Sequence, residues 1–479
     1  VDLVIYTTYF WKVKAINTNQ EEMWALVTDS FFDYGMFTTV NQIQDAMDSF
    51  NNRPMIDGAV KYNRTLRPEN SPYWVSQNPH MMEGTDLTIL PGTELRFFEG
   101  TTLMIASGLH FYGTDLDSIR LVGFDETTIW GGIEFYDNSI VLPLHVSANG
   151  ELIGGNIAEY IYVKNAERPL KMATNQDIFL KDVTIKEYEA GLEIGSGSYI
   201  INTSIENAEP NSELTDNFGI NGGIYLEEVS VSNARGYGIN CSSEAVLKNV
   251  TVYDNEGYGI SGGILFNDVL VYNNSGHGLS CNNSAILNRV LVENNSGYGI
   301  SGGLECDSCV VTNNQGYGIS CNIEASIFNS VFNGNTSYGI NGANHIANSQ
   351  VENNGSHGIN TNYNGSLISN IIQGNNGSGV SGGAILRENI IVSNNGHGIN
   401  CNSDADVIEN QIINNSSYAL NGGKIIKGNT IQDNGSSQSS HYAINCNADA
   451  RIDSNLISSN TGYAISGGSH INNNEIINN

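Results

Sequence analysis

The sequence is poor in proline, in basic residues and in long apolar runs, and each shortage excludes a class of protein. Only 8 prolines occur among 479 residues, so polyproline spacers are excluded. Twenty Lys and Arg stand against 50 Asp and Glu, a formal net charge of −30, and so acidic a surface repels nucleic-acid phosphate. No apolar run approaches the ~18 residues of a membrane span. We therefore expect no nucleic-acid partner and no membrane span.

Cysteine is also scarce, and five of the seven occupy one slot of a sequence repeat: Cys241, Cys281, Cys321, Cys401 and Cys446. If the repeats stack at strand spacing, members of this column on alternate coils stand about 10 Å apart. That separation exceeds the ~7 Å limit for a disulfide and is too long for two thiolates to share a metal. We interpret the column as small buried apolar residues. Cys306 and Cys309, the only C-x-x-C, form either a local disulfide or two free thiols.

The repeat itself starts at Ile220, where the motif Gly-Tyr-Gly-Ile begins to recur. Its closing aliphatic residue returns at gaps that alternate between 19 and 21 residues, with one gap of 24 around the Gly435–Ser440 loop. A period near 20 residues, rich in Asn, Gly, Ser, Val and Ile, is typical of a solenoid of short strands. The sequence therefore predicts an all-β, right-handed parallel β-helix. The anchors are Ile220, Ile239, Ile260, Leu279, Ile300, Ile319, Ile340, Ile359, Val380, Ile399, Leu420, Ile444 and Ile465.

Two further columns accompany the anchors. Asparagine lies five residues before the anchor, which predicts a ladder of stacked side-chain amides. Tyrosine or histidine lies two residues before it, which predicts stacked rings. The asparagines are Asn255, Asn274, Asn295, Asn314, Asn335, Asn354, Asn375, Asn394 and Asn415; the rings are Tyr237, Tyr258, His277, Tyr298, Tyr317, Tyr338, His357, His397, Tyr418, Tyr442 and Tyr463.

The chain divides into four predicted segments. Residues 1–35 contain a strand with alternating faces around Tyr9 to Ala15 and a second apolar run around Trp24. This stretch resembles the closing strands of a fibronectin type III domain, which implies a partial β-sandwich. We predict a connector over 36–80, irregular capping coils over 81–200 and regular β-helix repeats over 201–479.

The segment Leu87–Phe97, Leu-Thr-Ile-Leu-Pro-Gly-Thr-Glu-Leu-Arg-Phe, resembles the opening coils of secreted bacterial right-handed β-helix proteins of the pectate-lyase-like superfold. The resemblance covers about 400 residues and implies the fold. It implies less about activity, because one fold hosts many functions.

No set of residues in the sequence assembles into a recognisable active site, so we assign no catalytic, cofactor-binding or metal-binding residue and expect no cofactor. Gly-His-Gly at His277 and His397 resembles one polygalacturonase signature, but the other three are absent and both histidines occupy the ring column. The acids Glu244, Glu324 and Asp404 (with Asp449) are too widely spaced to share a calcium ion. The irregular coils hold the remaining candidates: Arg96, Glu134, Lys164, Arg168, Lys181 and Lys186.

The regularity of the repeat favours a non-catalytic, extracellular or cell-surface structural protein: a stalk, filament component or adhesin. Its expected partners are further copies of itself, assembled head-to-tail or laterally, or cell-surface polysaccharide. The open final coil at Asn479 favours either continued sequence or a head-to-tail contact. The alternative is a carbohydrate-active lyase, hydrolase or epimerase that acts on a polysaccharide, with its site in coils 95–230.

Overall fold

The computed structural model describes residues 12–16, 22–26, 55–136, 139–147, 152–173, 175–208, 217–435 and 441–479. The chain forms two units, 1–50 and 51–479. In the first, β1 (Lys12–Ile16) and β2 (Glu22–Leu26) pair antiparallel as a hairpin. The rest of the segment predicted to resemble a fibronectin type III domain lies outside the described residues.

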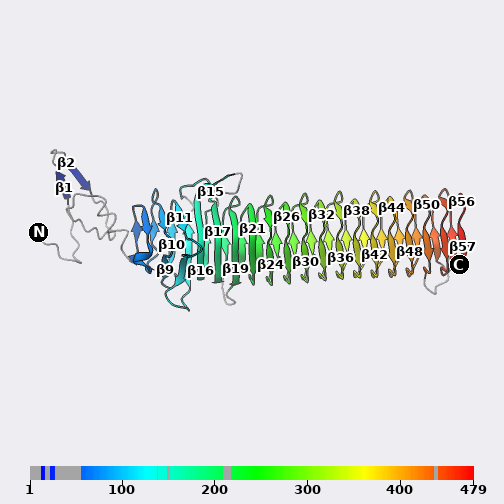
Figure 1. The fold of residues 1–479 in the computed structure, drawn as a ribbon, viewed down its shortest axis with the longest axis horizontal. Helices are drawn as coiled ribbons and strands as arrows, with labels where there is room; N and C mark the ends of the chain where they lie inside the picture. Colours follow the sequence, from blue (N-terminus) through cyan, green and yellow to red (C-terminus); the bar gives the residue numbers. More distant parts are fainter. Residues whose placement is uncertain are drawn as a thin grey trace. The chain divides into compact units, whose positions relative to one another are not determined.

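The second unit is an all-β, right-handed parallel solenoid of about 19 turns (Figure 1), so the predicted fold class is confirmed. Among the described residues its one helical element is a 3₁₀ turn, Pro68–Asn70. Parallel pairing begins at β3 (Met55–Ile56), which pairs with β6 (Tyr73–Val75), which pairs in turn with β9 (Glu94–Phe97). The coils thus begin inside the range predicted as a connector, because residues 55–80 carry no recurring motif by which stacked coils could be recognised in the sequence.

The strands of the coils from 55 to 208 are less uniform in length than the regular ones, from two residues in β3 to 16 residues in β16. They include β10 (Thr102–Ile105), β12 (Ile119–Gly123), β13 (Trp130–Phe135), β16 (Asn156–Lys171), β17 (Ile178–Tyr188), β18 (Leu192–Glu193) and β19 (Tyr199–Ala208).

Each regular coil has three short strands, for example β25 (Ile260–Ser261), β26 (Leu265–Asn267) and β27 (Leu270–Tyr272). One side chain per strand points inward, here Ile260, Phe266 and Val271, all buried. The long and short coils differ at the corner after the anchor, as the repeat predicts. Gly262 has a φ of +100°, and a Cβ there would lie 2.2 Å from the carbonyl oxygen of Cys241. Only glycine fits this corner of the short coil.

The predicted asparagine ladder is present and buried. Asn314 is typical: its Oδ1 accepts hydrogen bonds from the backbone N–H and the side-chain amide of Asn295, both 3.0 Å long. A second ladder, which the sequence analysis missed, lies at another corner, where the earlier coils carry valine. Its members are Ser330, Ser349, Asn370, Asn389, Asn410, Asn429, Asn455 and Asn474.

The ring column is also confirmed. From Tyr237 to His357 neighbouring rings have centroids 4.6 to 5.3 Å apart. The Nδ1 atoms of His277 and His357 accept backbone N–H bonds of 2.9 and 2.8 Å from the next coil, and burial lowers the pKa of both imidazoles. These histidines are therefore neutral members of a stack.

All seven cysteines are free, so Cys306 and Cys309 are two buried thiols. The cysteines of the repeat column are half-buried as residues, because they stand at a corner, but their thiols point toward the next coil. The Sγ of Cys241, for example, lies 3.5 Å from the carbonyl oxygen of Ser261. Burial disfavours the thiolate and raises the pKa to about 12 for the thiols of Cys241, Cys281, Cys321 and Cys401.

We expect these column thiols to resist alkylation in the folded protein, since the thiolate is the reactive species and a pKa near 12 leaves almost none of it at neutral pH. Iodoacetamide labelling, followed by peptide mass spectrometry, should modify Cys241, Cys281, Cys321 and Cys401 only after denaturation. Rapid modification of these four residues in native protein would contradict their burial.

Candidate functional site

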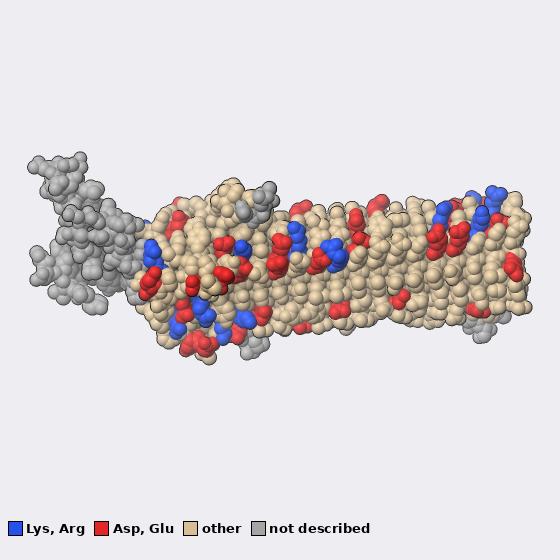
Figure 2. All heavy atoms as spheres, viewed as in Figure 1, with Lys and Arg blue, Asp and Glu red and all other residues tan. Residues whose placement is uncertain are grey.

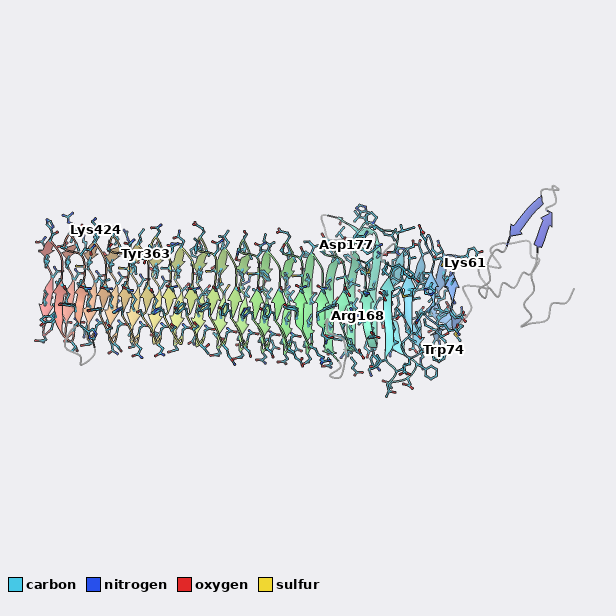
Figure 3. All side chains as sticks on the ribbon, turned by 180° about the vertical axis from the view of Figure 1, so that it is seen from behind. Lys61, Trp74, Arg168, Asp177, Tyr363 and Lys424 are labelled. Carbon is cyan, nitrogen blue, oxygen red and sulfur yellow. The ribbon has the colours of Figure 1, made fainter. Side chains whose placement is uncertain are left out.

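On the face shown in Figure 2, charged side chains gather on the coils at the N-terminal end of the solenoid and again on its last coils, and are sparser between them. These early coils also contain an open hollow of about 280 Å³. Its wall is formed by β10, β13, β16 and β18, and its lining is polar and charged: Thr102, Gly131, Ile133, Glu134, Glu167, Arg168, Lys171 and Glu193. Arg168 lies on the face seen in Figure 3.

Two adjacent glycines shape the hollow. A Cβ on Gly131 would lie 2.1 Å from the hydroxyl oxygen of Thr102, and a Cβ on Gly132 would lie 1.7 Å from the carbonyl oxygen of Arg168. Gly132 has a φ of +116°, which residues with a Cβ rarely adopt. The register between β13 and β16 shifts between Gly132 and Glu134. The glycines therefore permit a bulge, and bulges of this kind re-aim the side chains that follow them.

Four of the five charged residues that line the hollow form two ion pairs. The Nζ of Lys171 lies 2.6 Å from Oε1 of Glu134, and Nη1 of Arg168 lies 3.0 Å from Oε2 of Glu193. In strand register Glu134 pairs with Lys171, and Lys171 pairs with Glu193. The two glutamates are therefore two strands apart, about 10 Å between their Cα atoms at normal strand spacing, with Lys171 on the strand between them. All four side chains keep between a fifth and two fifths of their surface exposed.

The register column that holds Glu193 continues into the regular coils without charge. Glu193 pairs in register with Asn221, which pairs with Asn240, which is followed by Ser261. The change from two ion pairs to amides and hydroxyls marks the hollow as a local departure from the repeat. A local break with clustered charges is what a functional site on a solenoid would produce.

The structure brings together two of the six candidates that the sequence analysis left in the irregular coils, Glu134 and Arg168. Lys164 instead pairs with Glu126 at 2.9 Å and with Glu187 at 3.3 Å, and Lys186 pairs with Glu206 at 3.4 Å. These pairs lie outside the lining of the hollow.

The remaining two candidates, Lys181 and Arg96, also lie outside the lining of the hollow. Lys181 pairs in register with Glu159, whose carboxyl pKa is raised by burial although Lys181 opposes the shift. Arg96 lies beside Glu94, and its guanidinium faces the ring of Trp74. Neither contributes to the hollow.

Sequence reasoning missed Lys171 and Glu193, because only the bulge and the strand register bring them beside Glu134 and Arg168. The available signal was Gly131-Gly132 in Trp-Gly-Gly-Ile-Glu-Phe, which interrupts the alternation of a strand.

The features that the sequence analysis set aside as structural remain outside the hollow. Glu244, Glu324, Asp404 and Asp449 are exposed, and Lys424 lies 3.2 Å from Asp404 and 3.6 Å from Asp449. Within the described residues no group of three or more His, Cys, Asp or Glu side chains is placed to hold a metal ion. No helix among them is long and apolar enough to span a bilayer.

No protein family model matches the chain, and no curated protein matches it. Among solved structures the chain is similar to the periplasmic alginate epimerase AlgG, with a TM-score of 0.26 and 14% identity over 90% of this chain and 87% of that one. It is similar to the A-module of the Azotobacter vinelandii mannuronan C-5 epimerase AlgE6, with a TM-score of 0.18 and 13% identity over 82% and 90%. It is also similar to the catalytic domain of a GH87 α-1,3-glucanase, with a TM-score of 0.21 and 11% identity over 95% and 70%.

The expectation of a non-catalytic stalk, filament component or adhesin is not upheld. At 11–14% identity and TM-scores of 0.18 to 0.26, the likeness to the solved structures concerns the fold alone. The physical reason for the error lies in the coils that precede the regular repeat. The regularity after Ile220 does not extend to the whole solenoid, because the bulge at Gly132 and the ion pairs beside it interrupt the earlier coils.

Proposed function

We propose that this protein is a carbohydrate-active enzyme that acts on a polysaccharide in the hollow between β10 and β18. The observation that carries the proposal is the pairing of Glu134 with Lys171 and of Glu193 with Arg168, in a polar hollow that two glycines keep open.

The chemistry of these groups suits a sugar polymer. Carboxylates accept hydrogen bonds from hydroxyl groups and can transfer protons, whereas Lys171 and Arg168 donate to hydroxyl or carboxylate oxygens. Lyases, epimerases and hydrolases all need a group that takes or gives a proton beside the reacting ring. In inverting hydrolysis the two carboxyl groups stand about 6.5–9.5 Å apart, and a Cα separation of about 10 Å is compatible with that geometry.

The proposal is tested by incubating the protein with neutral glucans and with uronate polymers. New reducing ends report hydrolysis, ultraviolet absorbance of an unsaturated uronate reports lyase activity, and proton NMR of the intact polymer reports epimerisation. We expect Glu134→Gln and Glu193→Gln each to lower kcat by about 100-fold or more, because proton transfer by a positioned side chain contributes 10²–10⁴-fold.

Glu206→Gln is the matched control, since Glu206 is also partly exposed and paired with a lysine but lies outside the hollow. It should keep wild-type turnover. Wild-type turnover in both hollow variants, or no turnover of any polymer by the unaltered protein, would refute the proposal.

We also propose that the protein is located outside the cell or on its surface. A cell-surface polysaccharide is then the expected substrate. Division of the chain at residues 35 and 200, a fibronectin type III-like start and self-assembly stay predictions.

A further inference from the structure

Three aromatic rings lie together on the surface of the first coils, at the corner that leads into the wall of the hollow. Phe98 follows β9, and Phe124 follows β12 in the next coil; their rings stack with centroids 5.0 Å apart. The ring centroid of Trp74 lies 6.4 Å from that of Phe98 and 5.4 Å from that of Phe124. Phe98 and Phe124 keep 38% and 42% of their surface exposed. We call these three residues the aromatic corner.

The corner has a polar border made of charged groups that already pair with one another. Glu94 lies 2.5 Å from Nε of Arg96 and 3.3 Å from Nε of Arg120. The guanidinium carbon of Arg96 is 5.8 Å from the ring centroid of Trp74. Both arginine side chains are 40% exposed or more, so their remaining N–H groups can reach a ligand.

The corner is continuous with the hollow along the chain. Thr102 comes four residues after Phe98, and Gly131 comes seven residues after Phe124; Thr102 and Gly131 both line the hollow. In Figure 3 Trp74 lies nearer the N-terminal end of the coils than Arg168. A linear ligand bound in the hollow could therefore extend over the rings.

We propose that the aromatic corner is a binding subsite for a polysaccharide chain whose reacting unit lies in the hollow, an inference that rests on the proposed function. A sugar ring has an apolar C–H face and a rim of hydroxyl groups. The rings of the corner offer an apolar surface for the face, and Arg96, Arg120 and Glu94 offer donors and acceptors for the rim.

The size of the corner favours a sugar chain over a protein partner. Aromatic side chains bury about 150–250 Å² each, so Phe98 and Phe124, exposed by some two fifths, and the less exposed Trp74 together offer roughly 200 Å². A stable protein–protein interface needs about 800 Å² from each partner. A few sugar units can cover the corner completely, whereas a folded protein would need much more surface than the rings supply.

The test compares the wild type with the double variant Phe98→Ala/Phe124→Ala. The control is Tyr363→Ala, because Tyr363 is an aromatic residue 75% exposed on the opposite edge of the solenoid in Figure 3. Binding is measured by affinity electrophoresis in gels that contain a polyuronate or a β-glucan. Kinetics are measured on the polymer and on short oligosaccharides, and circular dichroism checks that each variant folds.

We expect the double variant to bind the polymer at least about tenfold more weakly, since exposed aromatic anchors dominate binding at such sites. The loss should raise KM on the polymer much more than it lowers kcat, because the rings do not touch the reacting atoms. Polymer binding equal to that of Tyr363→Ala, or a wild type that binds neither polymer, would overturn the subsite.

The two proposals fail separately. Polymer binding that the double variant loses, in a protein that turns over none of the polymers, would support the subsite and refute the enzymatic proposal. Turnover that Glu134→Gln abolishes, with polymer binding that the double variant leaves unchanged, would support the enzymatic proposal and refute the subsite.

Discussion

Asn314→Ala is expected to lower the free energy of unfolding by about 3–5 kcal/mol, because it leaves several buried polar groups without partners at about 1–3 kcal/mol each. Oδ1 of Asn314 accepts two bonds from Asn295. Its Nδ2 carries two hydrogens and lies within hydrogen-bonding distance of three oxygens: the carbonyl oxygens of Val292 and Thr312, at 3.1 and 3.0 Å, and Oδ1 of Asn335, at 3.0 Å. Alanine replaces none of these groups, and the interior of the coil admits no bulk water to them.

Asn283→Ala is the control, because Asn283 is exposed on a neighbouring long coil. Exposed substitutions away from special features change stability by less than about 0.5 kcal/mol. Urea denaturation followed by circular dichroism compares the two midpoints with that of the wild type. Equal midpoints for the two variants would show that the ladder adds nothing to stability beyond the packing of the coils.

Gly132→Ala is expected to lower the free energy of unfolding by about 3–5 kcal/mol and to abolish polysaccharide turnover in the hollow. A positive φ strains any residue with a Cβ by about 1–3 kcal/mol. A Cβ 1.7 Å from the carbonyl oxygen of Arg168 also forces β13 and β16 apart, which adds to this strain. Arg168 and Glu134 flank the bulge, so their displacement would separate the groups of the two ion pairs.

Gly154→Ala is the matched control in β15 (Leu152–Gly154), since its φ is not positive and a Cβ there meets nothing within 4 Å. It should leave stability and turnover near wild type. Thermal unfolding and polysaccharide turnover are measured on both variants. A Gly132→Ala protein with wild-type stability would mean that the bulge relaxes freely, and wild-type turnover would mean that the hollow does not need it.

The regular coils could be predicted almost completely from the sequence. One anchor such as Ile260 per coil, with an asparagine five residues before it and a ring two residues before it, specifies stacking because each coil contacts only its neighbours. A column in the sequence is then a column in space. This is why the asparagine ladder, the ring stack and the glycine corner at Gly262 were all predicted correctly.

The second ladder could not be predicted from the sequence in this way. It changes from Val290 through Cys309 to Ser330 and Asn370, so no single residue type identifies the column in a sequence. Its polar members are buried because each bonds the next coil; Asn370 donates to Oδ1 of Asn389 at 3.0 Å, for example.

The sequence by itself determined the solenoid, its period and its alternating coils, since these follow from local repetition. Only the tertiary structure decided which charges meet at the hollow. Glu134, Arg168, Lys171 and Glu193 lie in irregular coils, where residue spacing does not reveal strand register. A bulge at Gly132 shifts that register, and the shift brings side chains up to 59 residues apart into one wall. Position along the chain predicts position in space only where the repeat is unbroken, and the candidate site lies where it breaks.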